Sequence, residues 1–156
     1  MHKDQHFNKE YVLEEWLSGQ EHRILQAAHD IAHNCIVHKD VLTELYPLRQ
    51  QMEDIATPLD FGGHILPNKR FVEKALMLIK ESVERTCLCA LTFERHAQNG
   101  HLMQQYGFKL HSEDYDTDFM AHECIIECPV CHQLYKIEEY DTGWHMTVTV
   151  VTPVTQ

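Results

Sequence analysis

The sequence predicts an α+β fold in which N-terminal helices pack on a small antiparallel β-sheet. Apolar residues recur with the period of an α-helix through the first half of the 156-residue chain, and with the period of a β-strand after Thr86. Hydrophobic residues make up 44% of the chain, which is enough for a sizeable core. Helices that come before the strands, instead of alternating with them, indicate a helical part and a separate sheet.

The clearest helix is expected to begin at Asn68, which is a favourable capping residue. Its apolar positions from Phe71 to Val83 fall on one half of the helical wheel, and charged residues fill the other half. Gly19 is placed to end the first helix, and Pro47 is expected to interrupt the third. The expected helices cover residues 8–17, 21–37, 40–52 and the segment from 68 onward, and a connector rich in glycine and proline covers 54–67.

Runs of alternating residues predict the sheet, and the turn residues 141–143 predict that its last two strands form a hairpin. The expected strands are 87–93, 119–128, 132–139 and 144–150. We place a helical part at residues 1–57 and a helix with the sheet at residues 58–156. The sequence leaves open whether these parts form one compact domain.

The charge balance favours a basic partner. Lysine and arginine total 13 and aspartate and glutamate total 24, so the net charge is −11. This disfavours binding to nucleic acid, which requires clustered basic residues. We see no secretory signal at the N-terminus and no apolar run of the roughly 20 residues that a membrane span needs, so we expect a cytoplasmic protein with no membrane contact.

Two close cysteine pairs predict a metal site. Cys87 and Cys89 form a C-x-C motif, and Cys128 and Cys131 form a C-x-x-C motif. In the cytosol, paired cysteines are more often metal ligands than disulfides. A strand would place the first pair on one face and a tight turn would present the second, as tetrahedral zinc requires. We therefore expect a structural zinc ion in a zinc-ribbon-like sheet, with four buried free thiols as the alternative.

The residue after the second pair departs from many zinc knuckles, which have glycine there. His132 at this position is expected to need a left-handed backbone, and it could replace a cysteine as a ligand. Cys35 and Cys124 lie outside the pairs, and Cys35 falls on the apolar side of its helix.

Three histidines, His22, His29 and His33, lie within about 40° of one another on a helical wheel. An i, i+4 pair such as His29 and His33 can chelate a metal. The alternative is a solvated polar helix face, which we favour. No nucleophile elbow, P-loop or dinucleotide-binding motif is present in the sequence.

Residues 58–151 resemble small immunity proteins of bacterial toxin systems, including contact-dependent inhibition systems. The resemblance depends on the order of motifs: a Phe61–Asn68 segment before a helix, the C-x-C, the Glu123–Cys131 segment and a strand with Trp144. It implies a protein that is not an enzyme and that binds and neutralises a cognate toxin domain in the cytosol. Many such toxins are nucleases with basic surfaces, which the charge of −11 would complement.

Two acidic runs that also contain tyrosine are the expected contact surface for this partner. Ordinary solvated loops are the alternative for both. Their residues are Glu113, Asp114, Tyr115, Asp116 and Asp118 in the first run, and Glu138, Glu139, Tyr140 and Asp141 in the second. Two other functions remain open: a metal-dependent enzyme that uses His29 and His33, and a zinc-ribbon adaptor or regulator in a larger assembly.

Overall fold

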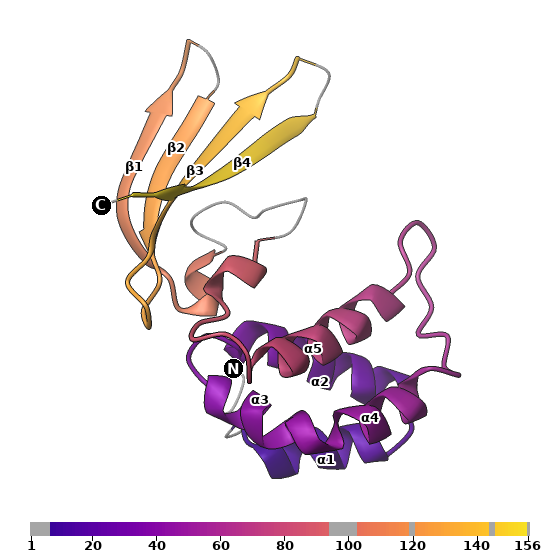
Figure 1. The fold of residues 1–156 in the computed structure, drawn as a ribbon. Helices are drawn as coiled ribbons and strands as arrows, with labels where there is room; N and C mark the ends of the chain where they lie inside the picture. The colour runs from indigo at the N-terminus through magenta and orange to yellow at the C-terminus, as the bar shows by residue number, and fades with distance from the viewer. Residues whose placement is uncertain (1–6, 94–102, 119–120, 144–145, 156) are drawn as a thin grey trace. The chain divides into compact units, whose positions relative to one another are not determined.

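Figure 1 shows a computed structural model of the chain, which describes residues 7–93, 103–118, 121–143 and 146–155. Helices come first and a four-stranded antiparallel sheet follows, so the predicted α+β class is confirmed. The chain divides into two compact units, Met1–Leu88 and Cys89–Gln156. Among the described residues, no helix is both long and apolar enough to cross a bilayer.

The first unit is a bundle of helices around an apolar core. Asn8 begins the first helix by accepting a hydrogen bond from the Tyr11 N–H at 2.8 Å, and Gly19 follows its end with φ of +66°. Trp16 is fully buried and donates its indole N–H to the Met52 carbonyl at 2.8 Å. The helices are α1 (Lys9–Leu17), α2 (Glu21–Asn34), α3 (Lys39–Leu45), α4 (Arg49–Ala56) and α5 (Lys69–Glu81). A short 3₁₀ turn at Tyr46–Leu48 separates α3 from α4, as the proline at position 47 predicted.

Helix α5 belongs to the first unit, where it packs mainly on α2. Val72, Ala75 and Ile79 on its apolar face are at most 1% exposed. The boundary therefore differs from the expected one at residue 57, because this apolar face is buried by other helices.

The segment between α4 and α5 projects from the helices in Figure 1 and is held by a compact turn. Phe61, Gly62 and Gly63 are consecutive residues with φ of +59°, +70° and +106°. The Asn68 N–H donates to the Gly62 carbonyl at 2.9 Å, and the Asn68 side-chain amide donates to the Phe61 carbonyl at 3.1 Å. Asn68 precedes α5 as predicted, but its side chain closes this turn and makes no capping hydrogen bond to the helix.

The second unit contains the sheet, whose strands lie in the order β1-β2-β3-β4. The strands are β1 (Lys109–Asp116), β2 (Ala121–Glu127), β3 (Leu134–Asp141) and β4 (Thr147–Val154). Each pairs antiparallel with the next, so the predicted hairpin of the last two strands is confirmed.

The sheet has one face with an apolar centre and one largely polar face. Cys124 lies opposite Ile137, and Ile126 lies opposite Tyr135, and all four side chains are at most 5% exposed. Because neighbouring residues on a strand point to opposite faces, Glu123 and its partner Glu138 lie on the other face.

One strand prediction was wrong, and one strand was not predicted. Residues 87–93 contain a 3₁₀ turn at Cys89–Leu91 and no strand. The first strand is instead Lys109–Asp116, where almost every residue is polar and exposed. This strand is at the edge of the sheet, so backbone pairing with β2 supports it without an apolar side-chain pattern.

Candidate metal centre and acidic sheet surface

The four paired cysteines come together as predicted. The Sγ atoms of Cys87, Cys89, Cys128 and Cys131 all lie within 4.8 Å of one another. Four thiolates around one tetrahedral ion, each about 2.3 Å from it, lie at most about 4 Å apart, so small side-chain shifts would complete the geometry. This arrangement can hold a metal ion.

The C-x-C pair reaches the site from a turn, not from a strand. The Thr92 hydroxyl and N–H both donate to the Cys89 carbonyl, at 2.6 and 3.1 Å, and these bonds close a short 3₁₀ turn. Leu88 between the two cysteines is fully buried and anchors this segment.

The C-x-x-C pair lies in a tight knuckle between β2 and β3. The Cys128 N–H donates to the Gln133 carbonyl at 2.9 Å, and the His132 N–H donates to the Cys128 carbonyl at 3.1 Å. His132 has φ of +62°, so the predicted left-handed backbone is confirmed. Its Nδ1 lies 2.7 Å from Oε1 of Glu127, and the cluster of four sulfur atoms is formed without it.

The site has a buried side and an open side. Cys89 and Cys128 are buried, Cys87 is half-buried, and Cys131 is exposed. The Tyr135 hydroxyl lies 3.1 Å from Sγ of Cys89, and Sγ of Cys131 lies 3.5 Å from the same sulfur. Burial is the main factor that raises the pKa of Tyr135, and the contact with Cys89 adds to it. The phenol therefore keeps its proton and can donate a hydrogen bond to the sulfur.

Three aromatic rings extend the buried side of this site. The Phe93 ring centroid lies 4.6 Å from that of Tyr135 and 5.5 Å from that of Phe108, and the Phe108 and Tyr135 rings meet edge to face. Such contacts hold the Tyr135 ring in place and exclude water from its hydroxyl.

The remaining cysteines and the histidine stripe lie elsewhere. Cys35 is fully buried, as predicted, and Cys124 is buried in the sheet. The His29 ring contacts the Phe71 ring at a tilt of 46°, with centroids 4.6 Å apart, and Nδ1 of His33 is 2.8 Å from the His29 carbonyl. In the described ranges, neither histidine belongs to a group of three or more close metal-ligating side chains. Burial lowers the pKa of His29, which favours a packed neutral ring.

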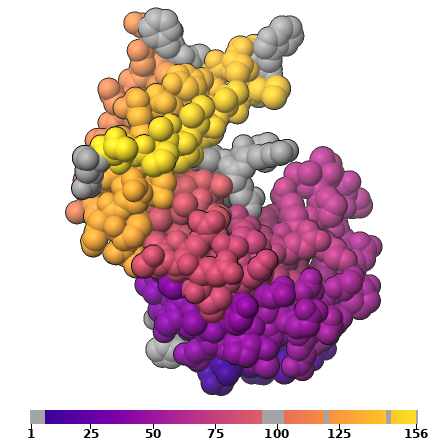
Figure 2. Space-filling view, viewed as in Figure 1, coloured from indigo at the N-terminus to yellow at the C-terminus, as the bar shows by residue number. Residues whose placement is uncertain are grey.

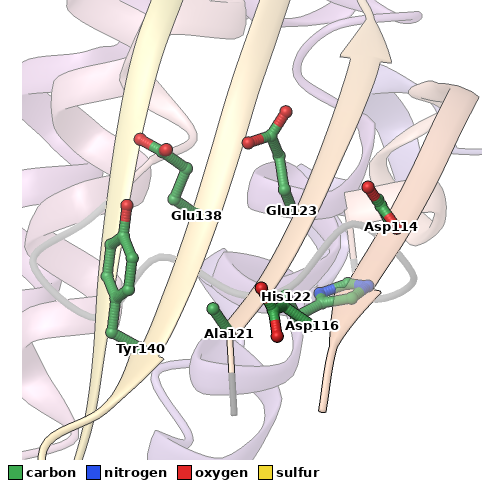
Figure 3. A pocket seen from close by; sticks show the side chains of 7 residues that line it. All are labelled: Asp114, Asp116, Ala121, His122, Glu123, Glu138 and Tyr140. Atoms are coloured by element: carbon green, nitrogen blue, oxygen red, sulfur yellow. The ribbon is translucent and has the colours of Figure 1, made fainter. Parts of the chain in front are cut away.

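The two acidic runs meet at one end of the sheet, but they are divided between its faces. Figure 3 shows the largely polar face, where carboxylates from β1, β2 and β3 stand side by side. They surround a hollow of about 220 Å³ that is lined by Asp114, Asp116, Ala121, His122, Glu123, Glu138 and Tyr140. Glu123 was not among the predicted contact residues, because the segment 119–128 was predicted only as a strand. The available signal was the alternation of polar Glu123 with apolar Cys124, which predicts that Glu123 points to the polar face.

Lys136 partly neutralises this hollow. Its Nζ lies 3.2 Å from Oε2 of Glu123 and 3.0 Å from Oε1 of Glu138. The hydrogen bond from Lys136 is the main cause that lowers the pKa of Glu138, and the Tyr140 hydroxyl contributes next. Asp114 and Asp116 add two further carboxylates, so the hollow has excess negative charge.

The other predicted contact residues lie on the opposite face or in turns. His122 reaches Glu113 at 2.7 Å and Glu139 at 3.5 Å, and its ring lies near that of Tyr115. A side-chain oxygen of Asp116 accepts the N–H of Asp118 at 3.0 Å, and one of Asp141 accepts that of Gly143 at 2.8 Å. The residues of the two acidic runs therefore form two separate groups of acidic side chains.

No family model, curated protein or solved structure matches this chain.

Proposed function

We propose that this protein is a non-catalytic binding protein, stabilised by one structural zinc ion, that neutralises a basic toxin domain. The convergence of four cysteine sulfur atoms within 4.8 Å carries the zinc part of the proposal. The acidic hollow and the net charge of −11 support a basic partner. The toxin as partner is supported by the resemblance of residues 58–151 to immunity proteins.

Zinc is the metal that best suits this donor set. Four thiolates are soft ligands, and a tetrahedral arrangement of four sulfurs is typical of zinc or an iron–sulfur centre. The cysteines come from two short turns beside a small sheet, as in structural zinc knuckles. A closed set of four ligands leaves no coordination position for a substrate or water, which supports a structural role.

A metal measurement tests the first part. The purified protein should contain one zinc ion per chain, and Cys128→Ser should lose it. Cys124→Ser is the matched control, because this buried cysteine lies on the adjoining strand outside the cluster. Unchanged zinc content in Cys128→Ser would contradict the site. A second bound metal that is lost in His29→Gln would favour the enzyme alternative.

Binding to a toxin domain tests the second part. We expect the gene to lie next to one for a large secreted toxin, and co-expression should rescue growth from that toxin's C-terminal domain. Asp114→Lys with Asp116→Lys should slow association and flatten its dependence on salt, because both residues line the hollow. Lack of a complex and of rescue would contradict the proposed function. Normal association of the double variant would exclude the hollow as the contact.

A further inference from the structure

The two edge strands of the sheet differ in how well they are protected from pairing with another strand. Strand β1 has a register irregularity between Leu110 and Ser112 and carries several acidic side chains. Both features are common ways to block pairing at an edge. Strand β4 reads Thr-Val-Thr-Val-Val-Thr-Pro-Val and has no charge over its eight residues. Threonine and valine also favour extended backbone.

The register identifies which backbone groups of β4 point away from the sheet. The Thr142 N–H donates to the Met146 carbonyl at 3.0 Å at the start of the hairpin. Antiparallel pairs alternate between hydrogen-bonded and non-hydrogen-bonded, so the residues with even numbers bond to β3. The N–H and C=O groups of Thr147, Thr149 and Val151 therefore point outward. Pro153 also lies at an outward-facing position, so its lack of an N–H costs no hydrogen bond to β3.

The side chains of β4 form an apolar strip on the outside of the molecule. Val148 and Val150 are 44% and 41% exposed on the same face as Glu138 and Tyr140. In Figure 2 this strand, drawn in yellow, lies on the visible surface. A strand added beside β4 would pair with the outward backbone groups, and its side chains on this face would pack beside these valines.

Carboxylates on β3 determine what kind of strand would fit. Glu138 lies opposite Val150, Glu139 opposite Thr149, and Asp141 opposite Thr147. Glu139 and Asp141 lie on the opposite face from Val148 and Val150. On an added strand, alternate lysine or arginine side chains could therefore extend toward these two carboxylates, while the residues between them pack beside the exposed valines. An acidic strand at the same edge would be repelled.

We propose that β4 binds an extended, basic segment of the partner as a fifth, antiparallel strand of the sheet. The backbone of the segment pairs with Thr147, Thr149 and Val151. Its alternate basic side chains face Glu139 and Asp141, and the residues between them pack beside Val148 and Val150 on the other face. This mode of binding, β-strand addition, obtains affinity from backbone hydrogen bonds and specificity from alternate side chains. The inference rests on the proposed function, since it assigns a docking mode to the same basic partner.

The test uses the full-length, zinc-loaded protein and a capped eight-residue peptide of alternating lysine and valine. We expect this peptide to bind and to slow the hydrogen exchange of the Thr149 and Val151 amides, which point away from β3. A peptide of alternating glutamate and valine is the charge control. Thr149→Pro removes one outward donor and should weaken binding about tenfold, which corresponds to about 1.4 kcal/mol. Thr149→Val keeps that donor and should bind normally.

The outcomes separate this inference from the proposed function. If the basic peptide binds but neither amide is protected and Thr149→Pro binds normally, the edge is not the docking site, although the preference for a basic ligand remains. If the acidic peptide binds as well as the basic one, both the inference and the basic partner are wrong. If the two amides become protected with rising protein concentration in the absence of peptide, a second copy of the chain occupies the edge and the inference is overturned.

Discussion

The hydroxyl oxygen of Tyr135 lies 3.1 Å from Sγ of Cys89, and both side chains are buried. A cysteine that binds a metal is a thiolate, and a hydrogen bond from a protonated phenol stabilises its negative charge. Tyr135 also packs on Phe93, so its ring has little freedom to turn away. This residue is therefore expected to position and stabilise a ligand without binding the metal.

Tyr135→Phe tests this role because it removes the hydroxyl and keeps the ring. We expect the variant to fold and to bind one zinc ion, but with an affinity about 10- to 100-fold lower, as is usual for the loss of a hydrogen bond to a metal ligand. Competition with a chromophoric chelator at fixed pH measures the affinity. Tyr140→Phe is the control, since Tyr140 lies on the same strand with its ring on the other face and 42% exposed. Equal affinities of the two variants would show that the Tyr135 hydroxyl has no effect on the metal.

Gly63 is the most restricted residue of the turn before α5. A Cβ atom there would lie 2.4 Å from the Leu66 carbonyl oxygen and 2.9 Å from the Asn68 nitrogen, and its φ is +106°. Gly62 has φ of +70°, but a Cβ atom there would meet nothing within 4 Å. We expect Gly62→Ala to lower the free energy of unfolding by about 1 kcal/mol from the left-handed backbone alone, and Gly63→Ala to cost more. Urea unfolding of the two variants compares them, and equal losses would contradict the close contact at Gly63.

Strand β1 shows where the sequence was insufficient to predict the fold. Periodicity located the helices and the strands that bury side chains, because each buries one face in a core. The residues of β1 are almost all exposed, and its pairing with β2 is a backbone interaction between distant parts of the chain. No local side-chain pattern reports such pairing, so the acidic run at residues 113–118 was interpreted as a contact surface alone.

The cysteine cluster could be predicted for a different reason. Its cysteines are chemically unusual residues. Their spacing in the sequence indicates a metal site whatever conformation the intervening backbone adopts. The prediction that these four cysteines come together was therefore correct, although the expected strand at Cys87 and Cys89 is a turn. The acidic residues have no such spacing rule, and only the register between strands brings Glu123 and Glu138 together.

His29 predicts a dependence of stability on pH. Burial is the main cause that lowers its pKa below 6.5, and the charge of His33 contributes next. As pH falls below about 6.5, the unfolded chain takes up a proton at this residue, whereas the folded protein takes it up only at a lower pH. His29 therefore contributes stability above pH 6.5 that is lost as the pH falls through this range to the lowered pKa.

Urea unfolding at pH 7 and pH 5, followed by helical circular dichroism, measures this effect. His29→Gln should lose less stability between the two pH values than the unaltered protein does. His22→Gln is the control, because His22 is an exposed residue on the same helix. If His29→Gln keeps the full pH dependence, the titration that destabilises the fold occurs at other groups.

The left-handed backbone of His132 predicts a stabilising substitution in the knuckle. A residue with a Cβ atom at φ of +62° is strained by roughly 1 to 2 kcal/mol, and glycine is not. His132→Gly also loses the bond to Glu127, which is exposed and therefore contributes little. We expect His132→Gly to be more stable than His132→Ala by about 1 kcal/mol, because both variants lose that bond and only the alanine keeps the strain. Thermal unfolding of the zinc-loaded variants compares them directly. An alanine variant as stable as the glycine variant would mean that the knuckle relaxes, and that the metal ligands do not impose the left-handed conformation at this residue.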